Sequence, residues 1–169
     1  MSDMEFDGVL DLTGTDGEVG FAAIPTGKYA AHVHEVEWRR TSNPDGSKTL
    51  PDSTPYLNIQ LRVDEDEPRD GMNVKNRVLF AKLFVPPADY DPEKAARMKN
   101  SMTNFLLSAG YELGEVQKKG FRIDPGNLLG RELTVIVKKY KSDYTGDWDN
   151  NVQGFKPAGE VTTAVGGLV

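Results

Sequence analysis

The sequence predicts a small all-β or α+β domain in which five strands are interrupted by one main helix. Two observations lead to this prediction: segments rich in alternating apolar residues recur along the chain, and a helical pattern lies between the third and the fourth of them. The chain has 169 residues, which suits one domain and is enough to bury a core without disulfides. A barrel of five strands with a helix between strands 3 and 4 is OB-like, so we expect that fold.

Period-two alternation places the strands. In the first strand Tyr29, Ala31 and Val33 share one face. The alternation then shifts by one residue to Val36 and Trp38, which indicates a β-bulge that bends the strand. In the second strand the inward residues are expected to be Leu57, Ile59, Leu61 and Val63. The five strands are expected at residues 28–40, 55–64, 73–85, 131–141 and 148–155.

The helix signal follows the third strand. Asp91 suits an N-cap, Pro92 suits the first helical position, and Gly110 suits the terminus. A second short helix is expected at residues 113–119. Two connections stand out as long or turn-forming: residues 41–54 between the first two strands and residues 142–147 between the last two.

Composition narrows the class of protein. The chain has no cysteine, which excludes disulfides and thiolate metal sites and favours the cytoplasm. The N-terminus lacks the features of a secretory signal, and no apolar run is long enough to cross a membrane, so we expect a soluble protein.

The formal net charge of -6 is unevenly distributed. Residues 1–27 hold six acidic residues and no Lys or Arg, and removing these six from the 26 acidic residues leaves 20, which the 20 Lys and Arg residues balance. We therefore expect three regions: a flexible acidic arm at residues 1–23, the OB-like domain at residues 24–158, and a flexible tail at residues 159–169.

Catalytic constellations are weak in this sequence. His32 and His34 could be two metal ligands on one strand, but no third ligand stands at a telling spacing. Acidic residues cluster at residues 64–67 and 143–149, in turns where carboxylates are commonly solvated. We expect no enzyme activity, no metal and no cofactor. A metal-dependent nuclease that uses these acidic turns stays open as an alternative.

Aromatic and basic side chains carry the stronger signal. Unpaired bases stack on exposed rings while cations track the phosphates. Trp38, Tyr56 and Tyr140 are expected to form a stacking groove, with the loops at residues 41–54 and 142–147 closing over it. The candidate nucleic-acid-binding residues are Trp38, Arg39, Arg40, Lys48, Tyr56, Lys138, Lys139, Tyr140, Lys141, Tyr144 and Trp148.

Four short motifs occur in a linked order: IPTGKY at residues 24–29, PYLNI at 55–59, LGRELTV at 129–135 and NVQGFKP at 151–157. With them the chain resembles a family of small phage single-stranded-DNA-binding proteins encoded near replication and recombination genes. The resemblance implies an OB-like barrel, no catalysis, and a role in protecting or presenting single strands. It also implies phage or host replication and recombination proteins as further partners.

One departure from that family concerns the C-terminus, where residues 162–169 carry no charged side chain, so recruitment of partners by an acidic C-terminal tail is not expected. A homodimer stays open, because a partly open barrel has exposed strand edges. The main alternative function is a protein-interaction module or inhibitor whose acidic surface imitates DNA and binds a host protein.

Overall fold

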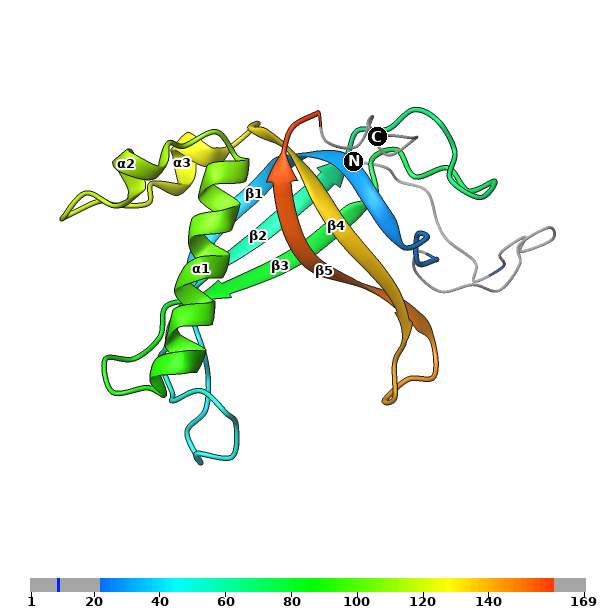
Figure 1. Ribbon diagram of the computed structural model, residues 1–169. Helices are drawn as coiled ribbons and strands as arrows, with labels where there is room; N and C mark the ends of the chain where they lie inside the picture. Colours follow the sequence, from blue (N-terminus) through cyan, green and yellow to red (C-terminus); the bar gives the residue numbers. More distant parts are fainter. Residues whose placement is uncertain (1–8, 10–21, 160–169) are drawn as a thin grey trace, which may run out of the picture.

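The computed structural model describes residue 9 and residues 22–159 of the chain (Figure 1). Most of the predicted acidic arm and nearly all of the predicted C-terminal tail therefore lie outside the described residues. The described part of the N-terminal segment already joins the domain, since Ala23 is 6% exposed and Ile24 is 1% exposed. No helix of the described part is both long and apolar enough to cross a membrane.

Five strands form one antiparallel sheet, which confirms the prediction of a β-rich domain. The strands are β1 (Gly27–Arg40), β2 (Pro55–Val63), β3 (Val78–Phe84), β4 (Glu132–Lys141) and β5 (Trp148–Pro157). Their order in the sheet is β3-β2-β1-β4-β5. β3 and β5 are thus the two edge strands, and within the described sheet they are not hydrogen-bonded to each other, so the sheet is not closed.

Three helices lie between β3 and β4: α1 (Pro92–Ser108), α2 (Leu113–Val116) and α3 (Pro125–Leu128). The helix predicted after Asp91 is confirmed, and the Asp91 carboxylate accepts a hydrogen bond from the Lys94 amide at 2.9 Å. α2 ends before the predicted residue 119. α3 was not predicted; it begins where the Asp124 carboxylate accepts a hydrogen bond from the Gly126 amide at 3.0 Å.

β1 contains the predicted bulge, and the bulge decides which side chains face the core. The register between β1 and β2 shifts between Val33 and Glu35. Val33 is buried before the shift, and after it Val36 and Trp38 lie opposite the buried residues of β2. The residues between them, Glu37 among these, therefore point to the outer face of the sheet.

β3 begins later than the sequence predicts, at Val78 rather than at residue 73. The segment before it is a turn, because Asn76 adopts a left-handed backbone with φ of 64° and the Asn73 side chain accepts a hydrogen bond from the Lys75 amide at 3.1 Å. Val74 is 0% exposed and plugs the core from this turn. Val74 is apolar and β-branched, as strand residues often are, which explains why the strand was predicted to begin at residue 73.

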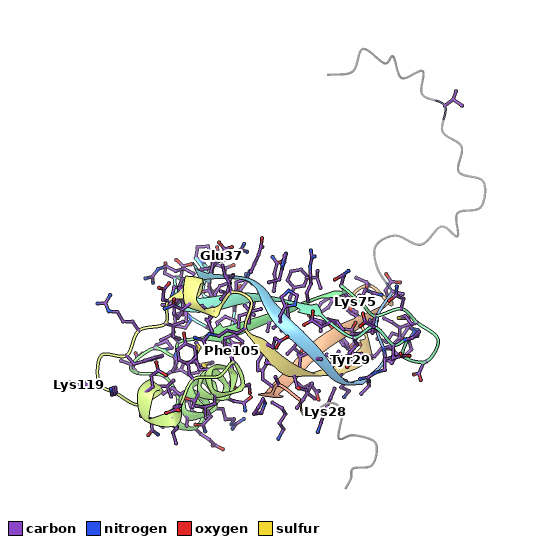
Figure 2. All side chains as sticks on the ribbon, turned by 90° about the horizontal axis from the view of Figure 1, so that it is seen from above. Lys28, Tyr29, Glu37, Lys75, Phe105 and Lys119 are labelled. Carbon is purple, nitrogen blue, oxygen red and sulfur yellow. The ribbon has the colours of Figure 1, made fainter. Side chains whose placement is uncertain are left out.

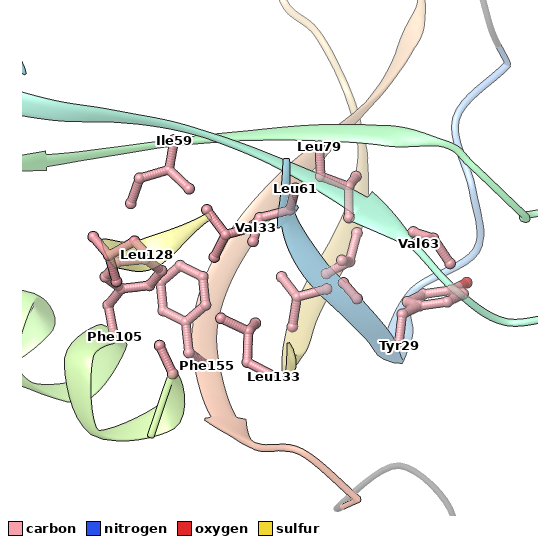
Figure 3. Close-up of a cluster of buried hydrophobic side chains, with 14 of the residues drawn as sticks. Tyr29, Val33, Ile59, Leu61, Val63, Leu79, Phe105, Leu128, Leu133 and Phe155 are labelled. Atoms are coloured by element: carbon pink, nitrogen blue, oxygen red, sulfur yellow. The ribbon is translucent and has the colours of Figure 1, made fainter. Parts of the chain in front are cut away.

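The core is a single cluster that α1 covers at one end (Figure 3). Apolar side chains from all five strands, α1 and α3 meet in it. Phe105 of α1 faces Phe155 of β5, with ring centroids 5.0 Å apart. The neighbouring Asn104 accepts a hydrogen bond from the Phe155 amide at 3.2 Å. α1 is therefore fixed to the edge strand β5.

The acidic turn after β2 is tied down by ion pairs. The Arg69 guanidinium donates to the Glu65 carboxylate at 2.8 Å and to the carbonyl oxygen of Lys28 at 2.6 Å. It also stacks 4.3 Å from the centroid of the Tyr29 ring. Arg69 thus joins this turn to the start of β1, and the charge of Glu65 is balanced locally.

Tyr29 gives the fold a testable pH dependence. Burial is the main cause that raises the pKa of its phenol above the ordinary 10.0. The unfolded chain therefore releases the phenolic proton at lower pH, so the stabilisation is complete below pH 10 and is lost as the pH rises through the native pKa. The phenol also donates to the carbonyl oxygen of Pro25 at 2.5 Å.

We expect Tyr29→Phe to lower the free energy of unfolding by about 1 kcal/mol near neutral pH, because it removes that hydrogen bond. The difference between the two proteins should shrink above the ordinary pKa of 10.0. Urea unfolding followed by circular dichroism at several alkaline pH values measures it. A difference that stays constant across this range would contradict the role of Tyr29.

Candidate nucleic-acid interface

The outer face of β2 and β3 gathers aromatic, amide and cationic side chains. In an antiparallel pair, directly opposed residues project to the same face of the sheet. The core residues Leu57, Ile59 and Leu61 of β2 alternate with Tyr56, Asn58 and Gln60, so these pairs lie on the outer face, where Asn58 is itself buried at 8% exposure. The opposed residues are Tyr56 with Phe84, Asn58 with Lys82, and Gln60 with Phe80.

These side chains are arranged so that rings and a cation lie together. Phe80 is 62% exposed, which is unusual for a phenylalanine unless it meets a partner. The rings of Tyr56 and Phe84 lie 5.2 Å apart, and the Lys82 ammonium lies 5.5 Å from the Tyr56 ring centroid. An unstacked base could lie on such rings while the ammonium group meets a phosphate.

β1 extends this face with charged residues. Arg39 lies opposite Tyr56, and Glu37 lies opposite Asn58. Arg39 and Glu37 form an ion pair, and the Glu37 hydrogen bond is the main cause that raises the pKa of the Arg39 guanidinium. β1 therefore contributes the Arg39 guanidinium to this face, and its charge is already paired with Glu37.

Three hollows lie next to one another along β3, and neighbouring hollows share Lys82 or Phe80 as a lining residue. The loop hollow, of about 440 Å³, is lined by the loop at residues 41–54 together with Tyr56 and Lys82. The seam hollow, of about 700 Å³, lies between the edges of β3 and β5 and shares Lys82 and Phe80. The Ala22 hollow, of about 560 Å³, continues from Phe80 to Gln60. We refer to these three adjacent hollows as the track.

Polar groups line the seam hollow. Beside Lys82 it contains Arg97 of α1, with amide side chains from α1 and from β5. The amides belong to Asn100, Asn104, Asn151 and Gln153. Amide and guanidinium groups donate hydrogen bonds to phosphate and sugar oxygens, so the lining suits a polynucleotide backbone.

The loop at residues 41–54 is built around one buried side chain. The Asn43 amide nitrogen donates to the carbonyl oxygens of Lys48 and Leu50 at 3.2 and 2.6 Å, and its oxygen accepts from the Lys48 amide at 3.0 Å. Arg40 donates to the carbonyl oxygen of Ser53 at 2.9 Å at the base of the loop. Arg40 and Lys48 are thus presented on an ordered loop at the rim of the loop hollow.

The predicted residues of β4 and β5 divide between two faces of a hairpin. Val137 is buried, so alternation places Lys139 and Lys141 on its face and Lys138 and Tyr140 on the opposite one. Trp148 lies opposite Lys141, and the Lys139 ammonium lies 5.1 Å from the centroid of the Trp148 ring. The hairpin therefore carries a second ring with a cation, separate from Tyr140.

Figure 1 shows this hairpin and the loop at residues 41–54 projecting towards the same side of the molecule, at its two ends. Tyr144 lies at the hairpin tip and is 100% exposed. Asp149 and Asn150 of β5 line the Ala22 hollow together with Phe80. The hairpin thus adjoins the far end of the track.

The structure does not bring Trp38, Tyr56 and Tyr140 into one groove as predicted. Trp38 lies opposite Leu57, which is 0% exposed, and so belongs to the core side of the sheet, while Tyr56 lies on the outer face. Tyr140 lies on the β4 extension beyond Gly27, at the other end of β1. Figure 2 shows Glu37 and Lys28 far apart along β1, and at about 3.3 Å per residue this strand is tens of ångströms long.

Sequence reasoning missed Phe80, Lys82 and Phe84, which hold the centre of the track. The run VLFAKLF of β3 is apolar enough to suggest a strand that is buried on both faces. Leu79 and Leu83 are buried while Phe80 is exposed, so one face of β3 is exposed to solvent. The lysine between the two phenylalanines was the available signal.

The histidines and acidic residues are engaged with one another. His32 and Asp64 lie 2.8 Å apart, and the His34 ring centroid is 6.4 Å from that of His32. Lys75 pairs with Asp66 at 2.8 Å. Within the described part of the chain, no group of three or more His, Asp or Glu side chains converges as a metal site would require.

No protein-family model matches this sequence, and no curated protein is significantly similar to it. A function must therefore be argued from the outer face of β2 and β3, the adjacent hollows and the loop at residues 41–54.

Proposed function

We propose that the protein binds single-stranded DNA without reading its sequence, and that it supports phage DNA replication or recombination from the host cytoplasm. The domain would be an OB-like barrel that is open between β3 and β5. The observation that carries the proposal is the track along β3, in which neighbouring hollows share Phe80 or Lys82.

Physical complementarity favours a single strand over a duplex. Exposed rings offer stacking surfaces for bases, and the bases of a duplex are already stacked on each other. In OB folds the face of strands 2 and 3 and the loops that follow strands 1 and 4 bind oligonucleotides. Tyr56, Phe80 and Lys82 lie on the same face, the loop hollow adjoins the loop after β1, and the Ala22 hollow is lined by Asp149 and Asn150, close to the loop after β4.

Binding through rings and cations is expected not to depend on the base sequence of the DNA. Stacking tolerates every base, and the cations beside the rings meet phosphates, which are common to all sequences. The amide of Gln60 is the group on this face that could add a preference, because Asn58 is buried.

The alternative of an acidic DNA mimic receives less support. Such a surface needs unbalanced carboxylates, yet Glu65 is paired with Arg69, and Asp66 is paired with Lys75. Asp64 lies within hydrogen-bonding distance of His32. Two carboxylates of the acidic turn are therefore each paired with a cation.

The test is fluorescence anisotropy of labelled oligo-dT titrated with the full chain at several salt concentrations, with a duplex of equal length as control. We expect tighter binding to the single strand and a slope of log K against log salt near about -3, from phosphate contacts by Arg40, Lys48, Lys82 and Arg97. Binding that is absent at low salt, or equal for the duplex, would overturn the proposal.

A further inference from the structure

A second surface lies on the core side of β1, and it meets the loop hollow at Phe84, which lines both. It is a groove of about 590 Å³ between α1, residues 116–123 and the ends of β1 and β3. Trp38, which is 41% exposed, forms part of its wall. The other apolar lining side chains include Met102, Leu106, Val116, Phe121 and Ile123.

The charged residues of this groove have one sign. Lys99 and Arg122 line it, and no acidic residue among those described does. Neither cation takes part in an ion pair with another described residue. An apolar groove with two unneutralised cations fits a segment that combines apolar anchors with carboxylates.

The chain itself contains such a segment in residues 4–12, MEFDGVLDL, where apolar residues alternate with Glu5, Asp7 and Asp11. Residues 13–21 then carry Gly14, Gly17 and Gly20, a composition typical of flexible tethers. We propose that residues 4–12 dock in the groove of the same chain. Phe6 and Leu10 would be the apolar anchors, and the carboxylates would meet Lys99 and Arg122.

The tether is long enough for docking within one chain. Ala22 lines the Ala22 hollow together with Phe80, while Phe84, farther along β3, lines the groove. The distance from Phe80 to Phe84 along the strand is about 13 Å. Residues 13–21 can span up to about 30 Å. A tether of this length gives the segment an effective concentration on the order of millimolar, which favours the chain's own groove over that of a second copy.

The docked arrangement is a second state of the chain. Val9, the one described residue of the segment, is 75% exposed in the structure, and the groove there is open. Docking would cover the Trp38 ring. The inference does not require DNA binding, because Trp38 lies on the face of the sheet opposite to Tyr56 and Phe80.

The experiment is acrylamide quenching of Trp38 fluorescence in the full chain, with Trp148→Phe as background so that Trp38 is the remaining tryptophan. We expect the double variant Phe6→Ser/Leu10→Ser to raise the quenching constant by about twofold, because the exposed indole loses its cover. The matched control is Val19→Ser in the tether, which removes an apolar side chain without touching the anchors and should leave quenching unchanged.

Reversing the charges of the groove gives an independent test of the proposal. Lys99→Glu/Arg122→Glu should raise quenching in the same way, and adding Glu5→Lys/Asp7→Lys should restore protection. Unchanged quenching in Phe6→Ser/Leu10→Ser overturns the proposal, whatever the charge variants do to folding. Protection that disappears on about a hundredfold dilution would assign the segment to a second copy and overturn docking within one chain.

Discussion

Replacing Tyr56 and Phe80 together by alanine is expected to weaken binding of a single-stranded oligonucleotide at least about 30-fold. Each ring that stacks on a base contributes about 1–3 kcal/mol, so two rings contribute at least about 2 kcal/mol. Both rings lie on the outer face of the β2–β3 pair, and Phe80 stands where the seam hollow and the Ala22 hollow meet. Anisotropy with labelled oligo-dT measures the change.

The matched control is Trp38→Ala, which removes a large exposed ring from the opposite side of the sheet. It should leave the affinity within about twofold, since it does not touch the track. Because Phe80 is 62% exposed, its replacement should not unfold the domain, and circular dichroism checks this. A folded Tyr56/Phe80 variant that binds normally would move the site elsewhere, and a large loss in Trp38→Ala would place it on the core side of β1.

Phe105→Ala is expected to lower the free energy of unfolding by about 3–5 kcal/mol, because it leaves a large cavity in the core. The ring is 0% exposed and packs against Phe155. Domains of this kind have total stabilities of about 5–15 kcal/mol, so the loss is a large fraction. Urea unfolding followed by circular dichroism gives the difference.

Lys94→Ala is the control for this substitution, because Lys94 is an exposed residue of the same helix. Its effect should stay within about 0.5 kcal/mol. If Phe105→Ala costs less than about 1 kcal/mol, α1 does not anchor the open edge of the sheet as the structure indicates.

Local patterns sufficed to predict most of the strands and α1. The period-two run of β2 and the Asp91-Pro92 start of α1 are strong signals that tertiary contacts do not override. The predicted start of β3 was wrong because the preceding residues form a turn, in which Asn76 has a left-handed backbone. The buried Val74 in this turn made it look like part of the strand. This turn has the residue composition of a strand but not the extended backbone of one. Only its long-range packing in the folded domain distinguishes the turn from a strand.

The site was harder to predict, because it depends on which residues face each other across strands. The bulge in β1 was predicted, yet its consequence for Trp38, which it turns to the core side, was not applied to the groove. Phe80 was assigned to an apolar strand, since the sequence does not show whether another element covers the outer face of β3. The structure places the predicted Arg40, Lys48 and Tyr56 together around the loop hollow, beside the long loop that turn composition predicts.

The unpaired edges of β3 and β5 have a mechanical consequence. Four strand pairs are locked by ladders of hydrogen bonds, whereas β3 and β5 are joined through α1 and side chains. Their separation can therefore change without breaking a ladder, which makes it the softest direction of deformation in the sheet. The gap between the edges of β3 and β5 can therefore adjust to the thickness of a ligand bound between them, while the curvature of the hydrogen-bonded sheet is preserved.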